Sequence, residues 1–219
     1  MIKAVAWDID GTLVDSEPLH LFALQQVCRA HSVDISDLAD EHFIGVHIGD
    51  VWRALQPRFP AEVNFKAWSR QIEAEFSAHR QRLVEVPGAV ETIRSFAALG
   101  VRQVAVSNSN RQVVDTNLDA IGVTGYMEVT ISLDDVCEGK PDPFPYRLAC
   151  YRLGLDPCDV LAVEDSSTGV ASAVAAGLRV ARLSGPPGAG TERTNAIERL
   201  SEVLRVAARA PEEWVSESV

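Results

Sequence analysis

Short apolar runs alternate with helical segments along most of this chain, and this alternation constrains its fold more than any other feature. Their lengths and spacing predict strands and helices in strict succession. Strands that alternate with helices form βαβ units, in which helices cover both faces of a parallel sheet. The sequence therefore predicts an α/β fold with a doubly wound parallel sheet. We expect strands at residues 2–7, 101–106, 126–132, 160–163 and 179–183, and helices at 89–99, 111–121, 144–153 and 167–176.

The segment over residues 16–85 departs from this alternation. Leu19, Phe22 and Ala23 begin an apolar pattern with the spacing of a helix, and little in the segment has the pattern of a strand. We expect a small α-helical domain here, inserted into a core formed by residues 1–15 and 86–219. Beyond the last predicted strand we expect a loop at 184–190, a closing helix at 195–208 and a frayed end from residue 211.

Composition and charge narrow the class of protein. The chain of 219 residues is 47% hydrophobic and carries a formal net charge of −11, which argues against nucleic acid or an anionic membrane as a partner. The four cysteines form no C-x-x-C pair, no apolar run reaches about 18 residues, and no basic stretch precedes an apolar one as in a signal peptide. We expect a cytoplasmic protein with reduced thiols, and the sequence leaves its oligomeric state open.

Two aspartates directly follow the first predicted strand. Side chains two residues apart on a strand share a face, so Asp8 and Asp10 are expected to point together. Neighbouring carboxylates are stable when a cation lies between them or when one is protonated, and both arrangements serve catalysis. Gly11 permits a sharp turn here, but it falls too early in the segment for the glycine of an EF-hand calcium loop.

Further polar residues follow the other predicted strands. In an open parallel sheet, ligands bind beyond the carboxyl ends of the strands. Ser107 and Asn108 follow the second strand, Lys140 comes after the third, and Glu164 with Asp165 follows the fourth. Carboxylates are hard oxygen ligands for Mg²⁺, whereas a lysine and a hydroxyl suit the oxygens of a phosphoryl group. The set predicts phosphoryl transfer.

Four segments, in order, resemble the motifs of the haloacid dehalogenase superfamily. These segments are Asp8–Thr12, Ser107–Ser109, Gly139–Pro143 and Val163–Val170. The chain is most similar to the branch with an α-helical cap inserted after the first motif, which holds β-phosphoglucomutases and small sugar-phosphate phosphatases. The resemblance covers residues 1 to about 185 and implies a Rossmann-like core, an inserted cap and a bound Mg²⁺.

The resemblance also implies roles for the residues at the strand ends. Asp8 is expected to be the nucleophile that forms an aspartyl-phosphate. Asp10 is expected to protonate the departing alcohol and then to accept a proton from the attacking water. Ser107, Asn108 and Lys140 are expected to hold the oxygens of the transferring phosphoryl group.

The same resemblance implies a set of metal ligands. Asp8 and Asp165 are expected to bind Mg²⁺ directly, with help from the backbone carbonyl of Asp10. Glu164 is expected to act through metal-bound water or by holding Lys140. Because adjacent residues at a strand end face opposite ways, Asp165 is the stronger candidate for a direct ligand.

The inserted helical segment supplies the remaining candidates. The loop at residues 44–50 resembles the loop with which the family's cap contacts the far end of the substrate. β-Phosphoglucomutases carry a lysine and an arginine where this chain has Ile44 and Ile48, so hydrolysis is favoured over a mutase reaction. His20 is a candidate for coupling cap closure to the acid/base group, and His47 is a candidate substrate contact.

The sequence thus predicts a Mg²⁺-dependent phosphatase whose partner is a small phosphorylated metabolite, with a sugar or sugar-acid phosphate favoured. A phosphomutase, which returns the phosphoryl group to the substrate, is the alternative. A binding protein that kept the fold without turnover is a third possibility. The sequence does not identify the substrate ester, because it does not give the three-dimensional arrangement of the cap side chains that select it.

Overall fold

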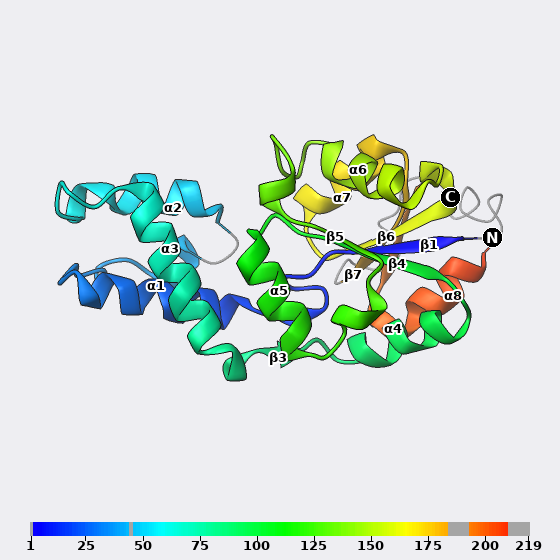
Figure 1. The fold of residues 1–219 in the computed structure, drawn as a ribbon, viewed down its shortest axis with the longest axis horizontal. Coiled ribbons are helices and arrows are strands. Elements are labelled where there is room, and N and C mark those ends of the chain that lie inside the picture. Colours follow the sequence, from blue (N-terminus) through cyan, green and yellow to red (C-terminus); the bar gives the residue numbers. More distant parts are fainter. Residues whose placement is uncertain (1, 44–45, 184–192, 210–219) are drawn as a thin grey trace. The chain divides into compact units, whose positions relative to one another are not determined.

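The structure is a computed structural model that describes residues 2–43, 46–183 and 193–209. The chain forms two compact units, one made of Met1–Asp15 with Val84–Val219 and the other of Ser16–Leu83 (Figure 1). The loop expected at 184–190 and the frayed end expected from residue 211 lie outside the described residues.

The first unit is built on a six-stranded sheet in the order β5-β4-β1-β6-β7-β8, with every neighbouring pair parallel. β1 lies in the middle, where Ala4 is in register with Arg102 on one side and Val160 on the other. The prediction of a parallel α/β sheet is confirmed. The strands are β1 (Ala4–Trp7), β4 (Arg102–Val106), β5 (Val129–Ile131), β6 (Val160–Glu164), β7 (Arg179–Leu183) and β8 (Thr194–Ile197).

Helices cover both faces of this sheet, as Figure 1 shows, with α6 and α7 on one face and α4, α5 and α8 on the other. All four residues of β1 are buried, as expected for a central parallel strand covered on both faces. The helices are α4 (Ala89–Ala98), α5 (Arg111–Ala120), α6 (Phe144–Leu153), α7 (Ser167–Ala176) and α8 (Val203–Ala208).

Two of these helices begin at polar caps that directly follow the strand ends. The Asn110 side chain accepts a hydrogen bond from the backbone N–H of Val113 at the start of α5, and Ser166 accepts one from Gly169 at the start of α7. Such caps satisfy N–H groups that have no partner within the helix. The caps therefore fix the turns between the strands and the helices at the edge of the sheet where the candidate site residues lie.

The chain after residue 193 differs from the closing helix predicted over 195–208. Thr194–Ile197 instead forms β8, which pairs in parallel with β7, and a shorter helix follows as α8. Ile197, Leu200 and Val203 are spaced three apart, which fits a helix equally well. The prediction was wrong because the free edge of β7 offers backbone partners that a local pattern does not reveal.

The second unit is helical, with α1 (Glu17–Ala30), α2 (Ile48–Leu55) and α3 (Phe65–Ala78). α1 packs against α3, and the buried Trp68 of α3 contacts Trp52 of α2 with ring centroids 5.0 Å apart. In the first unit, β2 (Val14–Asp15) pairs antiparallel with β3 (Val84–Glu85), so residues 84 and 85 are a short strand that the helical prediction missed. Short 3-10 turns occur at Asp40–His42, Gln56–Arg58, Arg80–Arg82, Thr124–Tyr126, Leu133–Asp135, Pro157–Asp159 and Leu200–Glu202.

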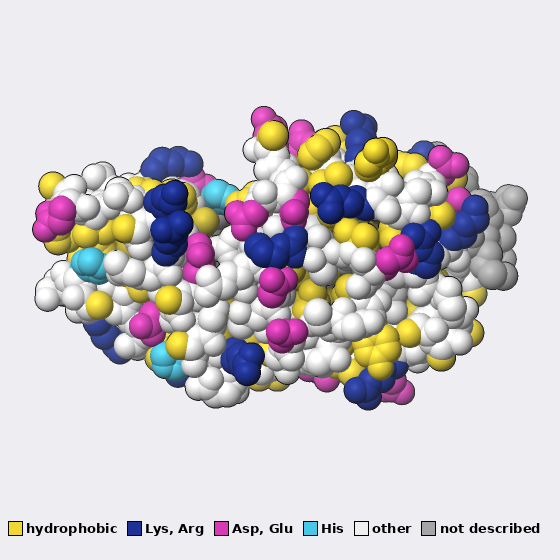
Figure 2. Space-filling model, viewed as in Figure 1, with side chains coloured by type: hydrophobic (Ala, Val, Ile, Leu, Met, Phe, Trp, Pro, Cys, Tyr) yellow, Lys and Arg dark blue, Asp and Glu magenta, His cyan; other side chains and the backbone are white. Residues whose placement is uncertain are grey.

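Among the described helices, none is both long and apolar enough to cross a membrane. On the face of the molecule shown in Figure 2, basic and acidic side chains are interspersed. The net charge of −11 is thus not gathered into one acidic patch on that face.

Candidate active site

The predicted site residues come together at the carboxyl edge of the sheet. Asp8 follows β1, Ser107 and Asn108 follow β4, Glu164 is the last residue of β6, and Asp165 comes next. Because β1 lies between β4 and β6, the residues after these strands meet at one place. A carboxylate oxygen from each of Asp8, Glu164 and Asp165 lies within 4.8 Å of the other two. This acidic cluster is the centre of the candidate site.

Lys140 is the buried cation of this cluster. Its Nζ donates hydrogen bonds to Asp8 Oδ1 at 2.7 Å, to Glu164 Oε1 at 2.5 Å and to the backbone carbonyl of Val106 at 2.8 Å. Burial lowers the pKa of Lys140, but Asp8 and Glu164 more than offset this effect, so the pKa is raised overall. The ammonium therefore stays charged and ties the nucleophile candidate to β6.

Glu164 is fully buried and is held by hydroxyl groups as well as by the lysine. Its Oε1 also accepts a hydrogen bond from the Tyr146 hydroxyl at 2.5 Å, and its Oε2 accepts one from Ser166 Oγ at 3.3 Å. Burial and the Glu164 charge raise the pKa of Tyr146 well above its usual value, so the phenol remains a donor. A Cβ at Gly169 would lie 1.9 Å from Glu164 Oε2, so only glycine lets α7 approach this carboxylate so closely. These contacts support the lysine-holding role of Glu164.

The pKa values of the two aspartates in the cluster, Asp8 and Asp165, are both raised. Burial, together with the charge of Glu164, raises the pKa of Asp8 although Lys140 opposes this shift. Burial and the charge of Asp8 raise the pKa of Asp165 to about 6, although Thr12 donates a hydrogen bond to it at 3.4 Å. One ammonium thus faces three carboxylates, so the cluster has fewer positive groups than negative ones.

The same two carboxylates fit a divalent cation. Asp8 Oδ2 is buried and has no hydrogen-bond partner in the described part of the chain. Gly11 has φ +81°, and a Cβ at this position would lie 2.2 Å from Asp165 Oδ2, so the turn after β1 packs directly on that oxygen. Hard oxygen donors such as these carboxylates are the ligands that divalent cations of this kind take in proteins, and Asp8 Oδ2 is available to one.

Asp10 is oriented by a separate set of donors. Ser107 Oγ and Ser109 Oγ donate to Asp10 Oδ2 at 3.0 and 2.9 Å, and Asn117 Nδ2 donates to Oδ1 at 2.9 Å. The charge of Asp10 also contributes to the raised pKa of Asp8. Sequence reasoning found Ser107 but missed Ser109 and Asn117. Asn117 had one available signal, namely a polar residue on the apolar face of its helix.

Asn108 contacts the backbone of the lysine loop. Its Nδ2 donates to the carbonyl of Lys140 at 2.9 Å, and its Oδ1 accepts from the N–H of Lys140 at 2.7 Å. A Cβ at Gly139 would lie 2.6 Å from Asn108 Oδ1, so the glycine before the lysine makes room for this amide. Both hydrogen-bonding ends of the amide thus join the loop after β4 to the loop that carries Lys140.

The two histidine candidates lie in the helical unit. The His20 ring on α1 packs against Phe76 of α3 with centroids 4.5 Å apart. His47 is exposed and caps α2, where its Nδ1 accepts the N–H of Gly49 at 3.1 Å. Residues 44 and 45 of the predicted substrate loop lie outside the described residues. The proposed roles of both histidines stay predictions.

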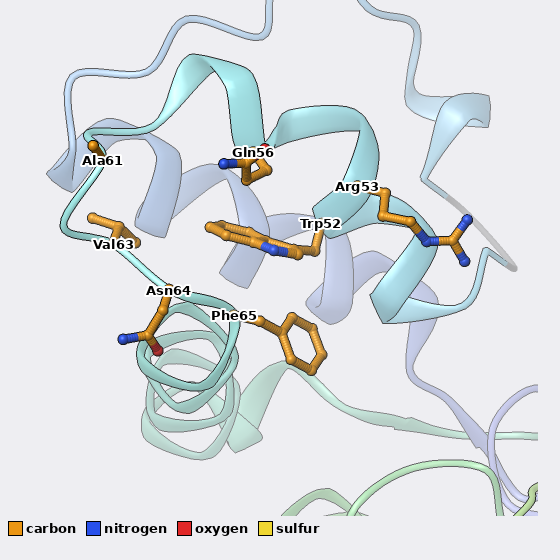
Figure 3. A pocket seen from close by; sticks show the side chains of 7 residues that line it. All are labelled: Trp52, Arg53, Gln56, Ala61, Val63, Asn64 and Phe65. Atoms are coloured by element: carbon orange, nitrogen blue, oxygen red, sulfur yellow. The ribbon is translucent and has the colours of Figure 1, made fainter.

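A pocket of about 400 Å³ also lies within the helical unit. Figure 3 shows the Trp52 ring between Gln56 and Phe65, whereas the Arg53 side chain points away from the ring. Arg53 forms an ion pair with Asp50. The pocket is lined by Trp52, Arg53, Gln56, Ala61, Val63, Asn64 and Phe65, so its character is aromatic and amide-rich.

Comparison with known proteins agrees with this geometry. The family profile of haloacid dehalogenase-like hydrolases matches residues 5–183. A validoxylamine A 7'-phosphate phosphatase from Streptomyces hygroscopicus subsp. limoneus is 29% identical over 185 residues, which are 81% of this chain and 84% of that protein. A phosphoglycolate phosphatase from Chromobacterium violaceum is 31% identical over 185 residues, 80% of this chain and 82% of its own. The crystal structure of CbbY from Rhodobacter sphaeroides in complex with phosphate has a TM-score of 0.80 at 26% identity and covers 93% of this chain and 96% of that one.

The chain belongs to the haloacid dehalogenase-like hydrolase family, and the resemblance expected from its four motifs is confirmed. Within that family it is an enzyme of the phosphatase type, a phosphoric monoester hydrolase.

Proposed function

We propose that this enzyme is a Mg²⁺-dependent phosphatase that hydrolyses a small phosphorylated metabolite through an aspartyl-phosphate at Asp8. The observation that carries this proposal is the buried contact of Lys140 with both Asp8 and Glu164, beside Asp165. The lysine fixes one oxygen of the nucleophile and offsets its charge, which lowers the repulsion that an incoming phosphate anion meets.

The first half of the reaction transfers the phosphoryl group to Asp8. A carboxylate oxygen of Asp8 attacks phosphorus while the bond between phosphorus and the ester oxygen breaks. The departing alkoxide takes a proton from the carboxylic acid of Asp10, so a neutral alcohol leaves. We expect the Ser107 hydroxyl, which donates to Asp10 in the absence of substrate, to turn to an oxygen of the transferring group when the ester binds.

The second half regenerates the enzyme. A water molecule gives a proton to the Asp10 carboxylate and attacks phosphorus, while the bond between phosphorus and the Asp8 oxygen breaks. Inorganic phosphate leaves, Asp8 returns as a carboxylate and Asp10 returns as an acid. Asn108 keeps Lys140 beside Asp8 by clamping the lysine's backbone.

Asp8 and Asp165 would hold Mg²⁺, because carboxylate oxygens are hard ligands and Asp8 Oδ2 has no hydrogen-bond partner among the described residues. The backbone carbonyl of Asp10 is a further candidate ligand. When bound, the ion neutralises charge on the nucleophile and on the phosphoryl oxygens. Glu164, whose Oε1 is shared by Lys140 and Tyr146, acts on the lysine instead.

A sugar or sugar-acid phosphate is the substrate class we favour. The similar proteins named above are phosphatases of validoxylamine A 7'-phosphate and of phosphoglycolate, which supports a small phosphorylated substrate. Ile44 and Ile48 occupy positions where β-phosphoglucomutases have cations, which supports release of phosphate rather than its return to the substrate.

A phosphate-release assay over sugar, polyol and acid phosphates tests the proposal. We expect turnover that EDTA abolishes and added Mg²⁺ restores, and a loss of at least about a hundredfold in Asp8→Asn. Asp115→Asn, an exposed aspartate on α5, is the matched control and should keep full activity. Turnover that ignores chelation, or that survives in Asp8→Asn, would refute the proposal.

A further inference from the structure

Asn117 is a fully buried amide in the interior of α5, on the face that also carries Val113, Val114 and Leu118. Asparagine is a poor helix former, and a buried amide is unfavourable unless both of its ends are hydrogen-bonded. Asn117 Oδ1 is buried without a hydrogen-bond partner in the described part of the chain. An apolar side chain would suit this position better if only the stability of α5 mattered.

The other end of the Asn117 amide contacts the acid/base candidate. Asn117 Nδ2 donates to Asp10 Oδ1 at 2.9 Å, whereas Ser107 and Ser109 both donate to Oδ2. The torsion that turns a carboxylate about its terminal bond is broad, so the plane of the group is better defined when a donor lies at each oxygen. Donors on both oxygens, from the loop after β4 and from α5, fix that plane.

We infer that Asn117 is a positioning residue that sets the orientation of the Asp10 carboxyl group for proton transfer to the leaving group. The inference rests on the proposed function, because it needs Asp10 to be the general acid. Asn117 acts through Asp10 and has no role of its own in the bond changes at phosphorus. Its loss should therefore affect only the substrates that need a proton on departure.

Two phosphate esters of similar size distinguish a leaving group that needs a proton from one that does not. Benzyl phosphate releases an alkoxide that must be protonated as it leaves, whereas p-nitrophenyl phosphate releases a phenolate that leaves without a proton. For each ester, kcat/KM covers the steps through the first irreversible bond cleavage, which is the transfer to Asp8. The ratio of variant to wild-type kcat/KM cancels differences in how the two esters bind.

The experiment measures both ratios in Asn117→Leu, with Asn117→Ala as a second variant that also removes the donor and leaves more space. We expect kcat/KM to fall about tenfold or more for benzyl phosphate and to change by less than about twofold for p-nitrophenyl phosphate. In an Asp10→Asn background, Asn117→Leu should cause no further loss with benzyl phosphate, because the group that it orients is gone.

Gln103→Leu is the matched control for the loss of a buried amide. Gln103 lies on β4 and bonds Trp7 and the carbonyl of Ile93, away from Asp10. This variant should lower the thermal midpoint yet leave the benzyl-to-nitrophenyl ratio unchanged. A merely structural role for Asn117 would produce the same pattern as Gln103, with the two esters affected equally.

Equal losses with both esters, or no loss with benzyl phosphate, would overturn the positioning role of Asn117. A failure of the proposed function has a different signature, because wild-type turnover would then be absent or would persist in Asp8→Asn.

Discussion

At the residue scale, the site holds more buried carboxylates than cations. Asp8 and Glu164 share the ammonium of Lys140, Asp165 lies beside them, and the hydroxyl of Tyr146 supplies a neutral donor to Glu164. A buried charge is tolerated when its hydrogen bonds are complete. The position of Lys140 therefore depends on how well Glu164 is held.

Removal of the Tyr146 hydroxyl should weaken the hydrogen bonding that keeps Glu164 in place. In Tyr146→Phe, Glu164 Oε1 loses one of its two donors while the ring still fills its space, so we expect a folded enzyme with kcat/KM lower by about tenfold. Steady-state kinetics with the substrate found in the phosphate-release assay make the comparison. Tyr151→Phe is the control, because this tyrosine of the same helix is 83% exposed. Equal activity of the two variants would show that Tyr146 contributes nothing to the lysine's position.

Some of these residues can be predicted from the sequence, and others cannot for a physical reason. Asp8 and Lys140 could be predicted because polar residues after parallel strands gather at one edge of the sheet. Tyr146 could not be predicted, because its aromatic ring belongs to the apolar core. Its hydroxyl reaches Glu164 only through the packing of α6 in the folded protein. Asn117 could be predicted only in part. The sequence shows a polar residue on an apolar helix face, but it does not show that Asp10 is its partner.

At the scale of elements, two carboxylates in the loop after β5 bind Arg111 at the start of α5: Asp134 accepts its backbone N–H at 2.8 Å, and Asp135 pairs with its side chain. Asp135 accepts hydrogen bonds from the N–H and the hydroxyl of Ser132 at 2.8 and 2.7 Å, and it also pairs with Arg111. Burial raises the pKa of Asp135, but the hydrogen bonds from Ser132 and the charge of Arg111 outweigh this effect and lower it overall. The link thus depends on an ionised Asp135.

This link predicts a change in acid stability. Because the folded-state pKa of Asp135 is below the unfolded value of about 4, its contribution is fully present above that value and is lost as the pH falls through the folded-state pKa. Asp135→Asn should therefore lower the free energy of unfolding at pH 7 and have less effect near pH 3, as measured by urea denaturation. Asp115→Asn, which removes only a long and exposed contact of 3.5 Å with Arg111, should change little at either pH. An equal effect of Asp135→Asn at both values would contradict the account.

The elements differ in how well local pattern predicts them. β6 and α7 were expected at 160–163 and 167–176 and occur at Val160–Glu164 and Ser167–Ala176, since a continuous apolar run and a capped helix are local signals. β8 was missed, because an edge strand of four residues is stabilised by its pairing with β7 rather than by its own composition.

At the scale of the whole molecule, the net negative charge opposes the binding of the substrate that we propose. A net charge of −11 repels an anionic substrate at long range, so local groups must bind it. Lys140 supplies such a cation inside the acidic cluster, and Mg²⁺ between Asp8 and Asp165 would supply another. The central parallel strand makes this possible, because it gathers residues from distant parts of the chain at one edge.

The central claim is that Asp8 takes the phosphoryl group. Rapid acid quench during turnover, followed by peptide mass spectrometry, measures this directly. The account predicts the mass of one phosphoryl group on the peptide that contains Asp8, lost on treatment with hydroxylamine and absent in Asp8→Asn. A fully active enzyme with no phosphorylated Asp8 at any quench time, or with the group on another residue, would contradict it.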